Sequence, residues 1–231
     1  GPMDNYSFRA ANRIVGNHEH APGIEMTLVG PTIKFHHESV ISITGGRVNA
    51  KIDGVSVNLH EPITVAKGAV LEVGKLASGC RAYLGIRNGI DVVEYLGSRS
   101  TFALGSLGGY NGRTLKFGDV LFLGQPQLSA NSLPGPVAKP TALPKALIPD
   151  LETKTWEIGV TCGPHGAPDI FKPEFVETFF SDEWKIHYNS NRFGVRLVGP
   201  KPKWARLDGG EGGLHPSNAH DYVYSMGAIN F

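Results

Sequence analysis

Glycine and proline interrupt this chain so frequently that long helices cannot account for most of it. Glycine occurs 30 times and proline 16 times in 231 residues. Glycine suits tight turns, and proline breaks both helices and the interior of sheets, so the segments between them must be short. We therefore expect many short strands joined by tight turns.

Most of these strands are predicted between residues 24 and 123. Apolar side chains alternate with polar or small ones over residues 24–28, 55–59 and 81–86, which is typical of strands with one buried face. An apolar run follows at 120–123. The breaks between segments lie at Gly30-Pro31, Gly45-Gly46, Asp53-Gly54, Gly79, Asn88-Gly89 and Gly118-Asp119. Six or more short strands at this spacing predict a barrel or a sandwich.

Helical patterns are few. Residues 4–15 predict a helix, because Asp4 can cap its start and Gly16 suits the left-handed position after its end. A second short helix is predicted from Pro173 to Phe180, with the proline in its first turn. Two further strands are predicted, at residues 156–160 and 193–197.

A proline-rich segment divides the chain. Residues 125–150 contain six prolines and few large apolar side chains, which is typical of an extended, semi-rigid linker. We expect a β-rich lobe with an N-terminal helix at residues 1–124 and a smaller α/β lobe at residues 151–231. The fold class predicted is mainly β with α+β elements.

The charge balance and the cysteine count exclude several classes of protein. Lysine plus arginine (22) nearly cancels aspartate plus glutamate (21), and no basic stripe suggests a nucleic-acid surface. No apolar run reaches the ~18 residues of a membrane span, and no secretion signal opens the chain. The only two cysteines, Cys80 and Cys162, lack the spacing of a zinc site or a disulfide framework. A reducing, cytoplasmic setting fits these features.

The strongest candidate site is a polar segment laced with glycine at residues 208–221. It combines carboxylates, imidazoles, an amide and a hydroxyl, and its four glycines allow a backbone to approach a ligand closely. The candidate residues are Asp208, Glu211, His215, Ser217, Asn218, His220 and Asp221. The alternatives are a polar surface loop, a metal site on His215 and His220, or a phosphate loop. The intervening proline disfavours the metal site, and the missing Gly-Lys-Ser/Thr disfavours the phosphate loop.

A second candidate lies at residues 189–192. Asn189, Asn191 and Arg192 can present several donors to an oxyanion, and the alternative is an asparagine-rich turn between two elements. The cluster Gly97–Thr101 contains serine and arginine but no neighbouring base, so we interpret it as structural. The histidines at 18, 20, 36 and 37 are interpreted as surface residues.

Several motifs together resemble the allophanate hydrolase subunit 2-like carboxyltransferase family, nearly from end to end. These motifs are Ser7–Asn12, Val15–Asn17, Leu28–Pro31, Arg81–Leu84, Gly89–Val92, Leu96–Thr101 and Gly118-Asp119. The segments 189–194, 204–221 and 227–231 look more specifically like urea carboxylases and the fused fungal-type urea amidolyases. Bacterial 5-oxoprolinase components share the first half but not this tail.

The resemblance implies a cyclophilin-like β-barrel lobe and a smaller α/β lobe. It implies transfer of a carboxyl group from carboxybiotin to urea, giving allophanate. Biotin is then carried by a separate domain, ATP is used by another, and a homologous second half completes the site. Gly1-Pro2-Met3 alone is typical of a protease-cleavage scar, but the resemblance favours a native Gly1-Pro2. It also implies that the chain is a fragment that is inactive in isolation.

The resemblance also suggests roles for the polar residues. Asp208, Glu211 and Asp221 would accept hydrogen bonds from urea, and Asn191, Arg192 and Asn218 would donate them. His215 or His220 would orient the substrate, with Asn189 and Ser217 as further binding residues. The alternatives are a related 5-oxoprolinase component and a Kip-type module that binds and regulates another protein.

Overall fold

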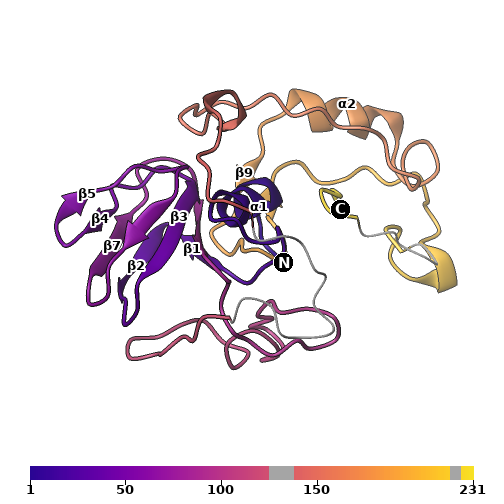
Figure 1. Ribbon diagram of the computed structural model, residues 1–231. Coiled ribbons are helices and arrows are strands. Elements are labelled where there is room, and N and C mark those ends of the chain that lie inside the picture. The colour runs from indigo at the N-terminus through magenta and orange to yellow at the C-terminus, as the bar shows by residue number, and fades with distance from the viewer. Residues whose placement is uncertain (125–137, 219–224) are drawn as a thin grey trace. The chain divides into compact units, whose positions relative to one another are not determined.

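The computed structural model describes residues 1–124, 138–218 and 225–231. The chain separates into two compact units, Gly1–Thr155 and Trp156–Phe231 (Figure 1), and each is described here by itself. In the described ranges, no helix has the length and apolar character needed to cross a membrane.

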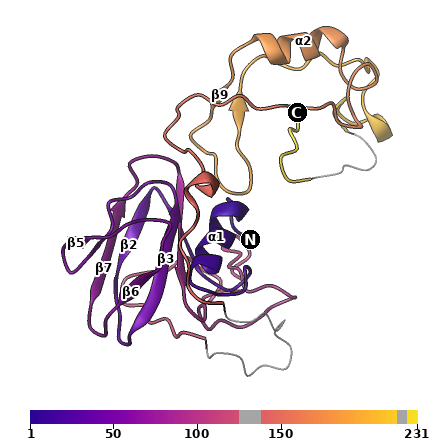
Figure 2. The same ribbon diagram turned by 45° about the horizontal axis from the view of Figure 1, so that its top comes forward.

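A single eight-stranded sheet forms the first unit (Figure 2). Its strands are β1 (Ile24–Thr27), β2 (Val29–Lys34), β3 (Ser39–Gly45), β4 (Lys51–Ile52), β5 (Val55–Ser56), β6 (Ile63–Val65), β7 (Val70–Lys75) and β8 (Arg81–Ile86). They follow the order β5-β4-β7-β2-β1-β8-β3-β6, and every pairing is antiparallel. The predicted fold class, mainly β with α+β elements, is confirmed.

Alternation along these strands builds the core. In β3, Ile41 and Ile43 are completely buried, and the register places Ile43 opposite Leu84 of β8. Leu71 of β7 and Val65 of β6 are equally buried and belong to the same continuous cluster. Burying such a side chain stabilises the fold by roughly 1.5–3 kcal/mol, so this cluster is the main source of stability in the unit.

Helix α1 (Asn5–Ile14) packs on the sheet and confirms the first helix prediction. The Asp4 carboxylate accepts a hydrogen bond from the Ser7 amide, and Gly16 adopts φ +77° just after the helix. Two buried hydroxyls of β3 fasten the helix: Ser42 Oγ donates to the Ala11 carbonyl and Thr44 Oγ1 to the Ser7 carbonyl, each at 2.7 Å.

Beyond β8 the prediction of further strands is wrong. Residues 91–122 form a long loop, closed at its base by the bridge between Ile90 and Leu123. The loop contains repeated left-handed glycines, among them Gly97, Gly108 and Gly112, and such positions interrupt an extended strand. Figure 1 shows this loop below the sheet.

Part of the expected linker lies in the first unit. The Thr141 amide donates to the Ile14 carbonyl and the Leu143 amide to the His60 carbonyl, both at 2.9 Å. The short 3-10 helix η1 (Lys145–Leu147) follows, and Thr155 ends the unit. Residues 125–137 lie outside the described part, so the three-part division of the chain stays a prediction.

The second unit has little regular structure. It contains α2 (Pro173–Ser181), the hairpin of β9 (Lys185–Ile186) and β10 (Leu197–Val198), and the 3-10 helix η2 (Glu211–Gly213). Helix α2 confirms the second helix prediction. The predicted strand at 156–160 is wrong, because these residues are exposed and pair with no described strand. The strand predicted at 193–197 is reduced to β10, since residues 191–194 form a turn.

Aromatic rings hold this second unit together. Phe231 packs edge-on against Phe171, Phe175 and Phe179 with ring centroids 5.1–5.6 Å apart, and it also contacts Trp184 at 5.8 Å. Edge-to-face pairs of this kind stabilise by ~0.5–1.5 kcal/mol beyond their burial. The final residue of the chain is therefore part of this small core.

Candidate functional site

The polar tail begins at a backbone junction beside α2. The Lys172 amide donates to the Lys203 carbonyl at 2.8 Å, and the Ala205 amide donates to the Ile170 carbonyl at 2.9 Å. Between these bonds, the Trp204 ring stacks on Phe171 with centroids 5.0 Å apart. Because Phe171 belongs to the aromatic core, the start of the tail is firmly attached to the second unit.

Glycine is required where the tail turns back on itself. The Gly210 amide donates to the Leu214 carbonyl at 2.8 Å. A Cβ atom at residue 210 would lie 2.1 Å from the His215 carbonyl oxygen and 2.8 Å from that of Asn218. Gly209 and Gly213 adopt φ of +98° and +73°, which side chains disfavour. The glycines therefore produce a compact double turn.

The His215 ring is held at two points. Its Nδ1 atom lies 2.8 Å from Ser217 Oγ and accepts a hydrogen bond from the Ser217 amide at 3.2 Å. Its edge packs against Trp204 with centroids 5.3 Å apart and an interplanar angle of 86°. A backbone N–H can only donate, so in the neutral ring the proton resides on Nε2. The ring therefore presents an N–H donor on its side opposite Ser217.

The other tail residues differ in how far their side chains are engaged. Asp208 is exposed and makes no hydrogen bond or ion pair with the described residues. Asn218 is half-buried, and its backbone N–H donates to the His215 carbonyl at 2.8 Å. The Glu211 backbone lies in η2, but its side chain is not described. His220 and Asp221 lie outside the described residues.

The second candidate cluster is a turn between β9 and β10. Asn191 and Gly194 exchange backbone hydrogen bonds at 3.1 and 3.2 Å, and Asn191 Oδ1 accepts from the Phe193 amide at 2.8 Å. Ser190 Oγ donates to the His187 carbonyl and accepts from the Arg196 amide. The side-chain oxygen of Asn191 thus shapes the turn, while its NH2 group is left to donate.

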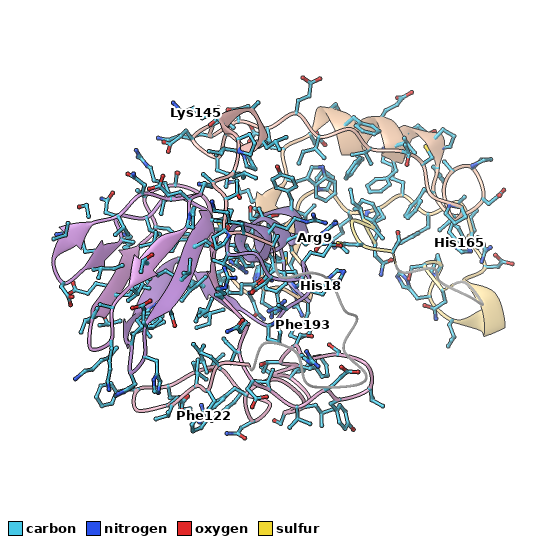
Figure 3. The ribbon with its side chains drawn as sticks, viewed as in Figure 1. Arg9, His18, Phe122, Lys145, His165 and Phe193 are labelled. Carbon is cyan, nitrogen blue, oxygen red and sulfur yellow. The ribbon has the colours of Figure 1, made fainter. Side chains whose placement is uncertain are left out.

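Both candidate clusters, residues 189–192 and residues 208–218, belong to the second unit. No hydrogen bond joins residues 189–191 to the tail between described atoms. Asn189 and Arg192 are exposed, and Phe193 beside them is labelled in Figure 3.

The first unit contains two hollows that the motifs alone did not predict. One, of about 190 Å³, is lined by serines of the Gly97–Thr101 cluster and by four apolar side chains from the same loop. The other, of about 200 Å³, is lined by Glu38, Arg87 and Asn88 among others. The sequence feature that could have indicated the first hollow is the set of apolar residues that flank Ser98 and Ser100.

Charged groups near α1 have structural partners. Hydrogen bonds from Arg13 and Arg9, at 2.7 and 2.6 Å, lower the pKa of Glu19 to about 2. Arg9 and the neighbouring His18 are labelled in Figure 3. Glu19 is therefore held in ion pairs with two arginines of α1 and has a structural role. In the ranges that the structure describes, no three histidine, cysteine or acidic residues are grouped to hold a metal ion.

The family model for the carboxyltransferase domain, subdomains A and B, matches residues 1–231, the full length of the chain. The chain belongs to this carboxyltransferase family. The predicted resemblance is therefore confirmed, and the motifs in α1, β8 and the loop 91–122 belong to a carboxyltransferase domain.

Two fungal proteins are close relatives of this carboxyltransferase chain. The urea amidolyase of Lachancea kluyveri is 68% identical over 232 residues, covering 100% of this chain and 13% of the relative. The crystal structure of the K. lactis urea amidolyase superposes with a TM-score of 0.92 at 66% identity, covering 100% of this chain and 14% of that one. The chain therefore spans only a small part of the proteins that it matches.

A bacterial member of the carboxyltransferase family is more distant. A 5-oxoprolinase component of Escherichia coli is 29% identical over 199 residues, which is 86% of this chain and 59% of the relative. The identity to the fungal urea amidolyase is more than twice as high and extends over the whole chain.

Proposed function

We propose that this chain is the carboxyltransferase portion of a biotin-dependent urea carboxylase, which transfers a carboxyl group from carboxybiotin to urea and yields allophanate. The observation that carries this proposal is the 68% identity to a urea amidolyase over every residue of the chain. The match to this relative extends over the polar tail as well as over the scaffold. The 29% identity to a 5-oxoprolinase component supports the alternative substrate much less.

Urea sets a clear demand on its binding site. It has four N–H donors and a single carbonyl acceptor, so it needs acceptors on its edges and a donor at its oxygen. The carboxylates of Asp208, Glu211 and Asp221 would accept from its N–H groups. Donors to the urea oxygen would come from Asn189, Asn191, Arg192 and Asn218.

His215 is suited to orient urea. With Nδ1 occupied by Ser217, its Nε2–H would donate to the urea oxygen and make the N–H that is lost from the reacting nitrogen more acidic. Ser217 then acts as a positioning residue, because it fixes which ring nitrogen carries the proton. His220 is proposed for the same task from the other end of the tail.

The free state of Asp208 supports a site in the tail. A carboxylate without a partner among the described residues, beside turns that only glycine permits, is available to a ligand. Holding urea at several points at once lowers the entropic cost of reaction. The chain's own residues thus bind urea, orient it and present donors where negative charge develops.

Biotin, when bound, supplies the carboxyl group that urea receives. Its ring has two apolar faces and therefore needs apolar walls as well as polar groups. Biotin would arrive on a separate carrier domain, ATP would be consumed by another, and a homologous second half would complete the site.

Single substitutions in the full-length enzyme test the proposal. We expect His215→Ala, Asn218→Ala and Asp208→Asn each to lower urea-dependent ATP turnover by about 100-fold or more, the usual cost of removing one group that stabilises developing charge. Carboxylation of biotin should continue unchanged, because a different domain performs it. Leu207→Ala is the matched control, since Leu207 is 89% exposed and adjacent to Asp208.

Wild-type turnover in all three variants would remove the tail from the site. The product decides the substrate: allophanate formed from urea supports the proposal, whereas glutamate formed from 5-oxoproline would replace it by the alternative. A chain that lacks both activities and binds a partner protein would instead be a regulatory module of the Kip type.

A further inference from the structure

The second hollow of the first unit contains two opposite charges that do not pair with each other. Its volume is about 200 Å³. Three short segments line it: residues 38–40, where β3 begins, residues 87–88, just after β8, and Leu123. The Glu38 carboxylate and the Arg87 guanidinium make no ion pair or hydrogen bond with any residue that the structure describes. Both charges are therefore available to a ligand.

Backbone contacts fix the shape of this hollow. The Arg87 amide donates to the Val40 carbonyl at 2.8 Å, which joins the first two segments. The third segment is held by the bridge between Leu123 and Ile90. These contacts set the walls before any ligand arrives, and a preformed site reduces the entropic cost of binding.

The rest of the hollow offers both polar and apolar groups. Ser39 is 8% exposed, and its hydroxyl has no hydrogen-bond partner within the described ranges. The Asn88 amide donates to Asn17 Oδ1 at 2.8 Å, which helps to hold Asn88 at φ +72° on the rim. Val40 and Leu123 are apolar and half-buried. A ligand would thus meet two charges, a hydroxyl and an apolar wall.

The charge pattern selects a zwitterion. A guanidinium presents parallel N–H donors that match a carboxylate, and a carboxylate accepts hydrogen bonds from an ammonium group. A simple anion would be attracted by Arg87 but repelled by Glu38, and a simple cation would meet the reverse. Only a ligand with both charges close together satisfies both side chains.

Size limits the ligand further. Drug-sized ligands occupy pockets of ~300–1,000 Å³, so this hollow accepts only a smaller molecule. The apolar wall of Val40 and Leu123 favours a short aliphatic group over a polar one. A carboxylate, an ammonium group and a short aliphatic side chain on one carbon are the chemistry of a small α-amino acid.

We propose that this hollow binds a small aliphatic α-amino acid, with its carboxylate on Arg87 and its ammonium group on Glu38. Its side chain would lie against Val40 and Leu123, and the Ser39 hydroxyl would donate to its carboxylate. The hollow belongs to the first unit, whereas the residues proposed to bind urea belong to the second. The inference goes beyond the proposed function and does not rest on it.

Ligand-observed NMR on the 231-residue chain tests this, with L-valine as the probe. We expect saturation transfer to its methyl groups. N-acetyl-L-valine lacks the ammonium charge, and L-valinamide lacks the carboxylate. Each should bind at least about tenfold more weakly than L-valine, because each leaves one charged side chain of the hollow without its partner.

Two variants assign the charges to their side chains. Glu38→Gln and Arg87→Gln should each weaken binding of L-valine by about tenfold, the effect of losing a hydrogen bond to a charged group. Arg87→Gln should also bind L-valine and L-valinamide equally, which a mere distortion of the hollow would not produce. Lys67→Gln is the control, because Lys67 is exposed in the same unit and does not line the hollow.

Absence of transfer to L-valine, or transfer unchanged in both charge variants, would overturn the inference. Binding of either analogue as tight as that of L-valine would also overturn it, because the hollow would then hold a simple anion or a simple cation. None of these results bears on urea-dependent turnover, which the substitutions in the polar tail test separately.

Discussion

The absence of a side chain at Gly85 allows α1 to lie close against the sheet. A Cβ atom there would stand 2.7 Å from the Ala11 carbonyl oxygen, the same oxygen that accepts from Ser42 Oγ. Such a contact is too short for carbon and oxygen, so either the helix or β8 must shift. Glycine at this position is therefore a packing requirement, although its φ is one that any residue adopts.

The Gly85→Ala substitution should destabilise the first unit by about 1–3 kcal/mol, the usual cost of forcing extra volume into a packed region. Thermal unfolding followed by far-ultraviolet circular dichroism measures the change. Gly159→Ala serves as the control, because a Cβ atom there would meet nothing within 4 Å. Equal melting temperatures for the two variants would show that the helix has room to move.

At the scale of elements, one carboxylate ties α1 to the segment that follows it. Glu19 contacts Arg9 at 2.6 Å and Arg13 at 2.7 Å, both on α1. Nearby, the buried Asn12 donates through Nδ2 to the Ala21 carbonyl at 2.8 Å. The sharp turn after α1 is thus held by polar contacts on two sides.

This arrangement predicts an acid-dependent loss of stability. The pKa of Glu19 is about 2 in the folded chain against an ordinary value of 4.5, so the unfolded chain binds the proton more readily. The stabilisation is complete above pH 4.5 and disappears as the pH falls toward 2. Chemical unfolding across this range should show a smaller pH dependence in Glu19→Gln than in the wild type. Glu72→Gln, on an exposed position of β7, should retain the wild-type slope.

At the scale of the whole molecule, the two units have separate cores and separate optical reporters. The eight-stranded sheet belongs to the first unit, whereas all three tryptophans, Trp156, Trp184 and Trp204, belong to the second. Tryptophan fluorescence therefore follows the second unit alone. Circular dichroism of the strands follows mainly the first.

The Phe231→Ala substitution should destabilise only the second unit. It removes a ring that contacts four other aromatic rings, and we expect a loss of about 2 kcal/mol for such a half-buried phenylalanine. The fluorescence transition should move to lower denaturant while the dichroism transition stays in place. A joint shift of both would mean that the two units unfold as one.

Local patterns in the sequence determined much of this protein. The alternation in residues 24–28 and 81–86 gave β1 and β8, because one face of each strand must be buried. Asp4 and Gly16 marked the ends of α1, since capping depends on neighbours a few residues away. The family motifs likewise identified a carboxyltransferase, and a polar glycine-rich tail could be singled out by composition.

Only the tertiary structure decided what the remaining residues do. Leu96 and Ser98 form part of a hollow because backbone pairing and close contacts at glycine fold residues 91–122 back on themselves, and no periodicity records this. His215 acquires a defined proton position from Ser217 and a fixed ring orientation from Trp204. The side-chain oxygen of Asn191 is already used in a turn. Such contacts depend on three-dimensional proximity and on which polar atoms are already satisfied, whereas strand and cap signals are complete within a short stretch of chain.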